Sequence, residues 1–240
     1  MSRPEGGATP DRSGGRVARV AELDHLLREP AAEPEGALIL LHGRAVDERD
    51  LYPMLDELDP ERKLLGITPG APLTNQPPGG RHWYVIERIG QPDTDSFVNT
   101  LNSLCRFLDD QLRERGVPWE KTVIGGFSQG AAVSCAVALG MGRPRAAGLL
   151  MMSGFYPMVR GWKLDPHAKR GMPAYVTHGI YDPVIPVGFG RKARDLLEEG
   201  GLQVAFREAR VQHTVDFALI GEMRDWVASV ISGEVPKATV

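Results

Sequence analysis

The chain has 240 residues, of which 42% are hydrophobic and 25% charged, so it can bury a sizeable core beneath an ordinary charged surface. The formal net charge is −3, and the basic residues are scattered among the acids, so a nucleic-acid partner is not expected. No stretch approaches the roughly 18 apolar residues of a membrane span. We therefore expect no stable membrane insertion and a soluble, cytoplasmic protein.

Residues 1–15 are rich in Gly, Pro, Arg and Ser and lack an apolar segment, which predicts a disordered lead-in rather than a signal peptide. Residues 16–240 contain no linker between two cores and predict a single domain. The two cysteines, Cys105 and Cys135, lie in apolar, helix-like stretches. This placement favours buried, reduced thiols over a disulfide or a catalytic thiol. The sequence has no Cys/His cluster of the kind that binds zinc.

The predicted elements begin with residues 17–28, whose apolar spacing suits either a short helix or a strand and turn. Residues 37–41 form the first firm strand, an apolar run closed by His42-Gly43 and typical of a strand buried on both faces. The elements that follow are a helix at 47–58, a strand at 63–67, a long loop at 68–92, a helix at 95–115, a strand at 121–125, a helix at 129–139, strands at 146–152 and 173–177, a helix at 189–199, a strand at 203–207 and a closing helix at 214–232.

This alternation of strands and helices predicts an α/β fold with a mostly parallel sheet and helices on both faces. The loop at 68–92 is dense in Pro and Gly, and a loop of this length is usually functional or disordered. The closing helix is predicted from one apolar face, formed by Phe217, Ile220, Met223, Val227 and Val230.

The strongest motif is Gly126-Phe127-Ser128-Gln129-Gly130, between a predicted buried strand and a helix that begins with small residues. A serine on a sharp strand-to-helix turn has strained backbone angles, and the flanking glycines avoid clashes there. The N–H groups at the start of the following helix favour a developing oxyanion. We therefore predict that Ser128 is a nucleophile rather than a residue of a structural turn.

A serine nucleophile needs a base and an acid that orients the base. His213 follows the last predicted strand and Asp182 follows the strand at 173–177, so both should lie above the carboxyl edge of the sheet. The chain order Ser, Asp, His is a known order for such triads. Glu208 and Asp216 are rival acids, although the dipole of the closing helix would also explain Asp216.

A tetrahedral intermediate needs two N–H donors, and we expect them from the backbone of Gln129 and of Arg44 in the turn after the first firm strand. The Arg44 side chain is either a solvated surface group or a guide for anionic substrates. His42 is predicted to be a buried, hydrogen-bonded structural residue. Trp83, Phe155 and Tyr156 are predicted to line the substrate pocket, with ordinary loop packing as the alternative.

Together, these pieces resemble the phospholipase/carboxylesterase family of α/β-hydrolases, which includes the acyl-protein thioesterases. The matching pieces are Leu41-His42-Gly43, the Gly126–Gly130 motif, Ser153-Gly154-Phe155, His178-Gly179-Ile180-Tyr181-Asp182 and the late His213. The chain departs from its relatives at Arg44-Ala45, where they often carry a second glycine, and at Gln212, where they often carry glycine.

The resemblance implies a compact esterase without a metal or organic cofactor, with Ser128, Asp182 and His213 as its triad. We expect it to cleave a small-molecule carboxylic ester through an acyl-enzyme intermediate, as a monomer or homodimer. The first alternative is a thioesterase or lysophospholipase that acts on long acyl chains. Further alternatives are a dienelactone-type hydrolase, a peptidase, and a non-catalytic binding protein built on a hydrolase scaffold.

Overall fold

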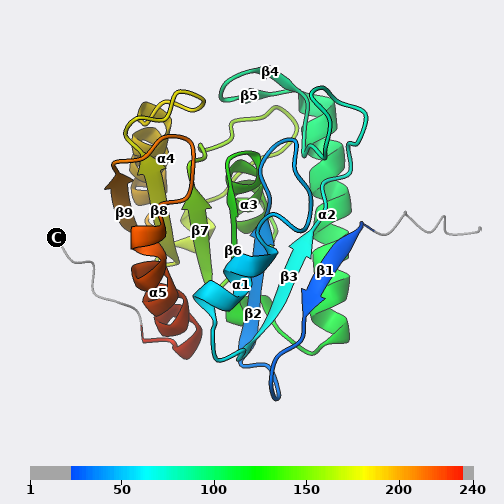
Figure 1. Cartoon of the computed structure of the whole chain (residues 1–240), viewed down its shortest axis with the longest axis vertical. Helices are drawn as coiled ribbons and strands as arrows, with labels where there is room; N and C mark the ends of the chain where they lie inside the picture. The colour runs from blue at the N-terminus through cyan, green and yellow to red at the C-terminus, as the bar shows by residue number, and fades with distance from the viewer. Residues whose placement is uncertain (1–22, 235–240) are drawn as a thin grey trace, which may run out of the picture.

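The computed structural model describes residues 23–234, so the predicted lead-in at 1–15 lies outside the described residues. Seven strands form a central sheet in the order β1-β3-β2-β6-β7-β8-β9, and every neighbouring pair is parallel except β1 and β3 (Figure 1). The strands of this sheet are β1 (His25–Arg28), β2 (Gly36–Leu41), β3 (Leu64–Pro69), β6 (Thr122–Phe127), β7 (Gly148–Met152), β8 (Pro173–Gly179) and β9 (Gln203–Ala209). The predicted α/β fold with a mostly parallel sheet is confirmed.

Within the described residues, five α-helices cover the two faces of the sheet. They are α1 (Tyr52–Leu58), α2 (Thr94–Glu114), α3 (Gln129–Leu139), α4 (Gly188–Glu199) and α5 (Ile220–Ser232). Helices α1 and α5 lie in front of the sheet and α2, α3 and α4 lie behind it (Figure 1). The two hydrophobic clusters divide in the same way, one containing the buried residues of α2, α3 and α4 and the other those of α1 and α5.

Strand β2 shows why this sequence forms a doubly covered sheet. Ala37, Ile39 and Leu41 belong to one hydrophobic cluster, and Leu38 and Leu40 belong to the other. Successive side chains of a strand point to opposite faces, so an unbroken apolar run can be buried only where helices cover both sides.

The predicted helix at 129–139 coincides with α3, whereas the predicted closing helix is wrong in its first six residues. Helix α5 begins only at Ile220, after a 3-10 turn at Phe217–Leu219. The Asp216 side chain accepts a hydrogen bond from the Ala218 N–H and so caps that turn. Phe217 is 78% exposed and is not part of the apolar face on which the prediction relied.

The predicted long loop at 68–92 contains a small hairpin. Strand β3 runs to Pro69, and the end of the loop forms β4 (Ile86–Arg88) paired with β5 (Gln91–Pro92). Two isolated β-bridges hold the rest of the loop in place, Val46 with Arg81 and Leu73 with His82. The hairpin lies at the end of the sheet toward which the parallel strands point (Figure 1).

Both cysteines are buried and unpaired. Burial raises the pKa of the Cys105 thiol to about 11, and it raises the pKa of Cys135 further. The thiols therefore remain protonated near neutral pH, because a thiolate is disfavoured in apolar surroundings.

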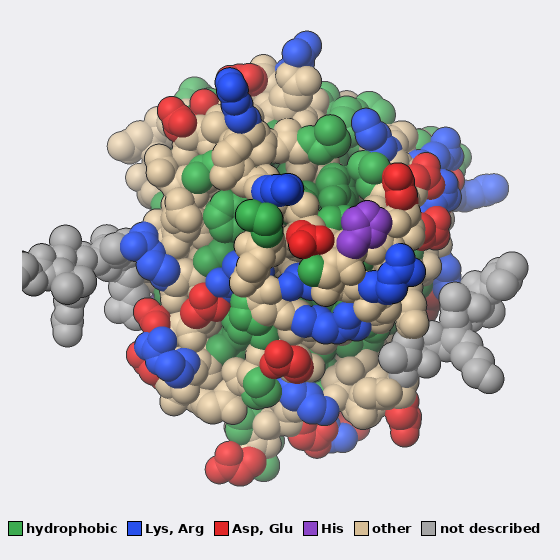
Figure 2. Space-filling model, turned by 180° about the vertical axis from the view of Figure 1, so that it is seen from behind, with side chains coloured by type: hydrophobic (Ala, Val, Ile, Leu, Met, Phe, Trp, Pro, Cys, Tyr) green, Lys and Arg blue, Asp and Glu red, His purple; other side chains and the backbone are tan. Residues whose placement is uncertain are grey.

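Among the described residues, no helix is long and apolar enough to cross a membrane. Figure 2 shows the face opposite to that of Figure 1, where basic and acidic side chains are interspersed with small groups of hydrophobic ones.

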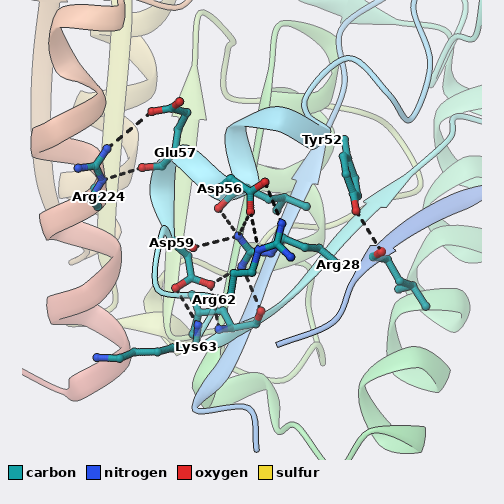
Figure 3. A network of polar contacts seen from close by, with 11 residues as sticks. Arg28, Tyr52, Asp56, Glu57, Asp59, Arg62, Lys63 and Arg224 are labelled. Atoms are coloured by element: carbon teal, nitrogen blue, oxygen red, sulfur yellow. Dashed lines mark hydrogen bonds and ion pairs between the residues drawn. The ribbon is translucent and has the colours of Figure 1, made fainter. Parts of the chain in front are cut away.

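Arg28, the last residue of edge strand β1, joins that strand to α1 through a buried polar network (Figure 3). Its guanidinium donates to the carboxylates of Asp56 and Asp59 and to backbone carbonyl oxygens, including those of Asp59 and Leu64, each 3.1 Å away. Arg28 is only 2% exposed and Asp59 only 7% exposed. Removing one partner from such a pair leaves an uncompensated buried charge.

We expect Arg28→Met to lower the free energy of unfolding by about 3 kcal/mol or more, because Asp59 would keep a buried charge without its partner. Urea unfolding of the variant and the parent measures the difference. The matched control is Arg62→Met, because Arg62 pairs with the same Asp56 but its side chain is 53% exposed. That exposed pair should contribute less than about 1 kcal/mol. Equal losses in the two variants would contradict the assigned role of Arg28.

Candidate active site

A cavity of about 320 Å³ opens at the carboxyl end of the parallel strands. It lies where the chain order of the sheet reverses, since β3 and β6 flank β2 on opposite sides. Ligands of open α/β sheets bind at such switch points. Ser128, Gln129, His213 and Arg44 all contribute to its lining, together with Gly43. The rest of the lining is mainly apolar and includes Val46, Tyr84, Ile86, Ile89, Phe155 and Ile185.

Ser128 occupies the turn between β6 and α3 with φ 55° and ψ −116°, a backbone conformation that a non-glycine residue rarely adopts. Glycine is required on both sides of this turn. A Cβ at Gly130 would lie 2.0 Å from the Leu41 carbonyl oxygen, and one at Gly126 would lie 2.6 Å from the same atom. The Ser128 N–H donates to the Met152 carbonyl oxygen at 2.9 Å, which ties the turn to β7.

The structure brings His213 and Asp182 into hydrogen-bonded sequence with Ser128. The Ser128 hydroxyl lies 2.9 Å from His213 Nε2, and His213 Nδ1 lies 2.6 Å from Asp182 Oδ2. With this spacing the imidazole can accept the hydroxyl proton while its Nδ1–H donates to the carboxylate. Such an arrangement can turn a serine hydroxyl into a nucleophile.

Backbone groups fix the Asp182 carboxylate in place. Its Oδ1 accepts hydrogen bonds from the N–H groups of Val184 and Ile185, each at 2.8 Å, which leaves Oδ2 for His213. Gly179, at the end of β8, lets the loop that carries His213 approach closely. A Cβ at Gly179 would lie 2.3 Å from the Gln212 carbonyl oxygen.

The rival acids have other partners. Glu208 forms an exposed ion pair with Arg191, at 2.6 Å from its Nε, and Asp216 caps the turn before α5. His178 is buried beneath the Asp182 loop, where its Nε2–H donates to the Ile185 carbonyl oxygen at 2.8 Å. Desolvation lowers the pKa of His178, so the buried ring is neutral at pH 7.

Arg44 and Gln129, the predicted donors to an oxyanion, flank Ser128 in the cavity lining. A Cβ at Gly43 would lie 3.7 Å from the Ser128 Cβ, so the turn that carries Arg44 passes directly beside the serine. Within residues 23–234, neither backbone N–H donates to another backbone group. Ala45 follows with φ 67°. Although it is not glycine, it adopts the left-handed conformation that glycine adopts most readily.

Of the three predicted pocket residues, only Phe155 lines this cavity. Trp83 is fully buried beneath it, where its indole Nε1–H donates to the His42 carbonyl oxygen at 2.8 Å. Tyr156 lines a separate surface hollow formed by residues 156–164. Consecutive residues such as Phe155 and Tyr156 point in different directions once the chain leaves β7, which the sequence pattern did not reveal.

The sequence analysis missed the apolar roof of the cavity, to which the β4–β5 hairpin contributes Ile86 and Ile89. Both side chains remain partly exposed, at 40% and 48%. The available signal was the presence of large apolar residues inside a Pro- and Gly-rich loop. Asp50 and Arg88, also missed, add charged groups to the lining. The Arg44 side chain, considered as a guide for anions, donates to the Pro77 carbonyl oxygen at 2.8 Å.

In the part of the chain that the structure describes, no three His, Cys, Asp or Glu side chains gather as metal ligands. The polar groups that converge in the cavity are a hydroxyl, an imidazole, a carboxylate and backbone N–H groups. These groups are the components of serine-dependent acyl transfer.

Known proteins resemble this chain over most of its length. A family model described as phospholipase/carboxylesterase matches residues 24–231. Acyl-protein thioesterase 1 of Candida albicans is 30% identical over 196 residues, which make up 74% of this chain and 84% of that protein. The protein of the same name from Debaryomyces hansenii is 30% identical over 189 residues, or 72% of this chain and 81% of that one.

Among solved structures, the Bacillus cereus carboxylesterase superposes with a TM-score of 0.76 at 20% identity, covering 88% of this chain and 95% of that one. A carboxylesterase from Mesorhizobium loti gives 0.74 at 18% identity, with coverages of 86% and 94%. These likenesses confirm the α/β-hydrolase fold. Since the family model spans most of the chain, this protein belongs to the phospholipase/carboxylesterase family of hydrolases, as its motifs predicted.

Proposed function

We propose that this protein hydrolyses carboxylic esters through an acyl-enzyme intermediate, with Ser128 as nucleophile, His213 as general base and Asp182 as the acid that orients the histidine. One observation carries the proposal. Three side chains from distant loops form a continuous hydrogen-bonded series at the cavity, with Ser128 Oγ 2.9 Å from His213 Nε2 and His213 Nδ1 2.6 Å from Asp182 Oδ2. Family membership supports the same chemistry.

The proposed reaction begins when Ser128 Oγ attacks the acyl carbon while His213 Nε2 takes the hydroxyl proton. The carbonyl oxygen becomes an oxyanion that the N–H groups of Arg44 and Gln129 stabilise, and Asp182 stabilises the imidazolium. When the tetrahedral intermediate collapses, the bond to the leaving oxygen breaks and His213 protonates the departing alkoxide. Water then attacks the acyl-enzyme by the same route, which releases the acid and restores Ser128.

The shape of the cavity bears on the substrate. A volume of about 320 Å³ is at the small end of ligand sites, which span about 300–1,000 Å³, and its mainly apolar lining suits a hydrocarbon acyl group. These features favour short acyl esters. The similarity to acyl-protein thioesterase 1 of Candida albicans favours a second candidate, hydrolysis of longer-chain thioesters.

Ser128→Ala should lower kcat for p-nitrophenyl acetate by about 10⁶, because the nucleophile of a triad cannot be replaced by its neighbours. A fluorophosphonate probe should label the parent once, at Ser128, as read by peptide mass spectrometry. Ser103→Ala, on α2 outside the cavity, is the control and should keep parental activity and labelling. Parental turnover by Ser128→Ala would refute the assignment, and a parent that neither turns over esters nor reacts with the probe would support a non-catalytic binding protein.

Asp182→Asn should lower kcat by about 10⁴, because an amide that donates to Nδ1 stabilises the wrong imidazole tautomer. The matched control is Glu208→Gln, which makes the same chemical change at the rival acid. Steady-state kinetics of both variants on one ester separates the two carboxylates. A large loss in Glu208→Gln with little loss in Asp182→Asn would reverse the assignment.

Phe155→Ala should move the preferred acyl length upward, because the ring borders the cavity and its removal leaves space for additional methylene groups. The measurement is kcat/KM for p-nitrophenyl esters from acetyl to dodecanoyl, with matched thioesters assayed in parallel. Tyr156→Ala is the control, since that side chain lines a different hollow. A parent that already prefers dodecanoyl thioesters would favour the second candidate.

A further inference from the structure

His42 is a buried histidine that the proposed reaction does not use. It follows β2 directly and is 1% exposed. Its Nδ1 lies 2.6 Å from the Gly43 carbonyl oxygen, and its Nε2 lies 3.0 Å from the Ala71 N–H. The first partner accepts a hydrogen bond and the second donates one, so both contacts are satisfied only by a neutral ring that carries its proton on Nδ1.

Burial keeps the ring in that form. Desolvation lowers the pKa of His42 to about 4, so the imidazole is neutral at pH 7. A neutral, fully hydrogen-bonded histidine in this position is held in one orientation and cannot act as a proton shuttle near neutral pH.

The Gly43 carbonyl that His42 holds is part of the peptide unit that supplies the Arg44 N–H. Because a peptide is planar and trans, fixing the direction of its C=O also fixes the direction of its N–H, which points the opposite way. Gly43 lacks a side chain and so leaves its own peptide more backbone freedom than another residue would. On the far side of Arg44, the Ala45 N–H donates to the Arg81 carbonyl oxygen at 2.9 Å, which fixes that end of the turn. The His42 ring acts on the Gly43 carbonyl itself, at 2.6 Å from Nδ1.

The residue that carries the second proposed donor, Gln129, is held by hydrogen bonds to the segment that also contacts His42. The Gln129 side chain accepts a hydrogen bond from the Trp83 N–H at 3.0 Å and donates one to the Tyr84 carbonyl oxygen at 3.1 Å. Trp83 also donates from its indole nitrogen to the His42 carbonyl oxygen, and its ring packs 5.1 Å from the His42 imidazole. His42, Trp83 and the Gln129 side chain therefore form one buried cluster, which contacts the segments that carry both proposed donors.

We propose that His42 is a positioning residue for the hydrolysis, which aims the Arg44 N–H at the oxyanion by holding the Gly43 carbonyl through Nδ1–H. This inference rests on the proposed function. A purely structural histidine would affect stability through either ring contact, without a specific effect on kcat. A positioning role depends on the Nδ1 contact in particular.

Two isosteric variants separate the contacts of His42. In His42→Asn the amide nitrogen occupies nearly the position of Nδ1 and can still donate to Gly43. In His42→Gln the amide reaches the position of Nε2, so its oxygen can accept from Ala71 while the contact to Gly43 is lost. Both variants exchange an aromatic ring for a neutral amide, so their effects on core packing are similar.

Removing one oxyanion donor lowers kcat by about 10²–10³, and a donor that is present but badly aimed should lose part of that. We expect His42→Gln to lower kcat for p-nitrophenyl acetate by about 10- to 100-fold with KM within about twofold, and His42→Asn to stay within about fivefold of the parent. The inhibition constant of a trifluoromethyl ketone, whose adduct carries an oxyanion, should rise in His42→Gln by the factor by which kcat/KM falls.

Trp83→Phe provides an independent measurement if either variant at position 42 fails to fold, as judged by thermal unfolding. It keeps a ring against His42 but removes the hydrogen bond to the His42 carbonyl, and it should lower kcat by about fivefold, the effect of one lost hydrogen bond. Equal activities of His42→Gln and His42→Asn, or loss of Trp83→Phe activity through KM alone, would overturn the inference. A parent that neither hydrolyses esters nor reacts at Ser128 would instead remove the proposed function, and the inference with it.

Discussion

The strained turn at Ser128 is the constraint on which the rest of the site depends. Its φ of 55° turns the chain from β6 into α3 within one residue, and this brings the start of α3 against the end of β2. The contact is so close that a Cβ at Gly130 would lie 2.0 Å from the Leu41 carbonyl oxygen and 2.5 Å from that of His42. Leu41 and His42 lead into the turn that carries Arg44. The serine and both proposed oxyanion donors therefore form one packed unit at the centre of the sheet.

Around this unit, two loops at the carboxyl edge are held by a buried histidine near the end of their own strand. His42 bonds the turn after β2, and His178 bonds the Ile185 carbonyl in the loop after β8. Asp182 accepts two backbone N–H groups of its own loop before it meets His213. Polar groups that are pre-oriented in this way need little rearrangement when charge develops, which is the condition for strong electrostatic stabilisation. Ile86 and Ile89 of the hairpin add apolar lining to the cavity beside the same groups.

The interactions that stabilise the sheet edge lie apart from this cluster. Arg28 joins β1 and α1, at the side of the sheet remote from β8 and β9, and its partners are carboxylates and carbonyls that do not line the cavity (Figure 3). The fold thus separates two uses of buried polar groups. At the sheet edge a cation satisfies several carbonyl oxygens, whereas at the cavity the polar residues are histidines and a carboxylate that contact a hydroxyl and backbone groups.

The sequence by itself determined the alternation of strands and helices, because apolar runs and helical spacing are local patterns. It also predicted Ser128, Asp182 and His213 as a triad, because each follows a predicted strand. It further indicated that the turn at Ser128 needs the glycines at 126 and 130 to avoid clashes. Only the tertiary structure decided which side chains face the cavity. Trp83 lies beneath it and Ile86 and Ile89 form its roof, although all three come from the same Pro- and Gly-rich loop. The start of α5 was likewise decided by the cap at Asp216. Loop direction depends on contacts between residues far apart in the chain, and a local pattern does not contain them.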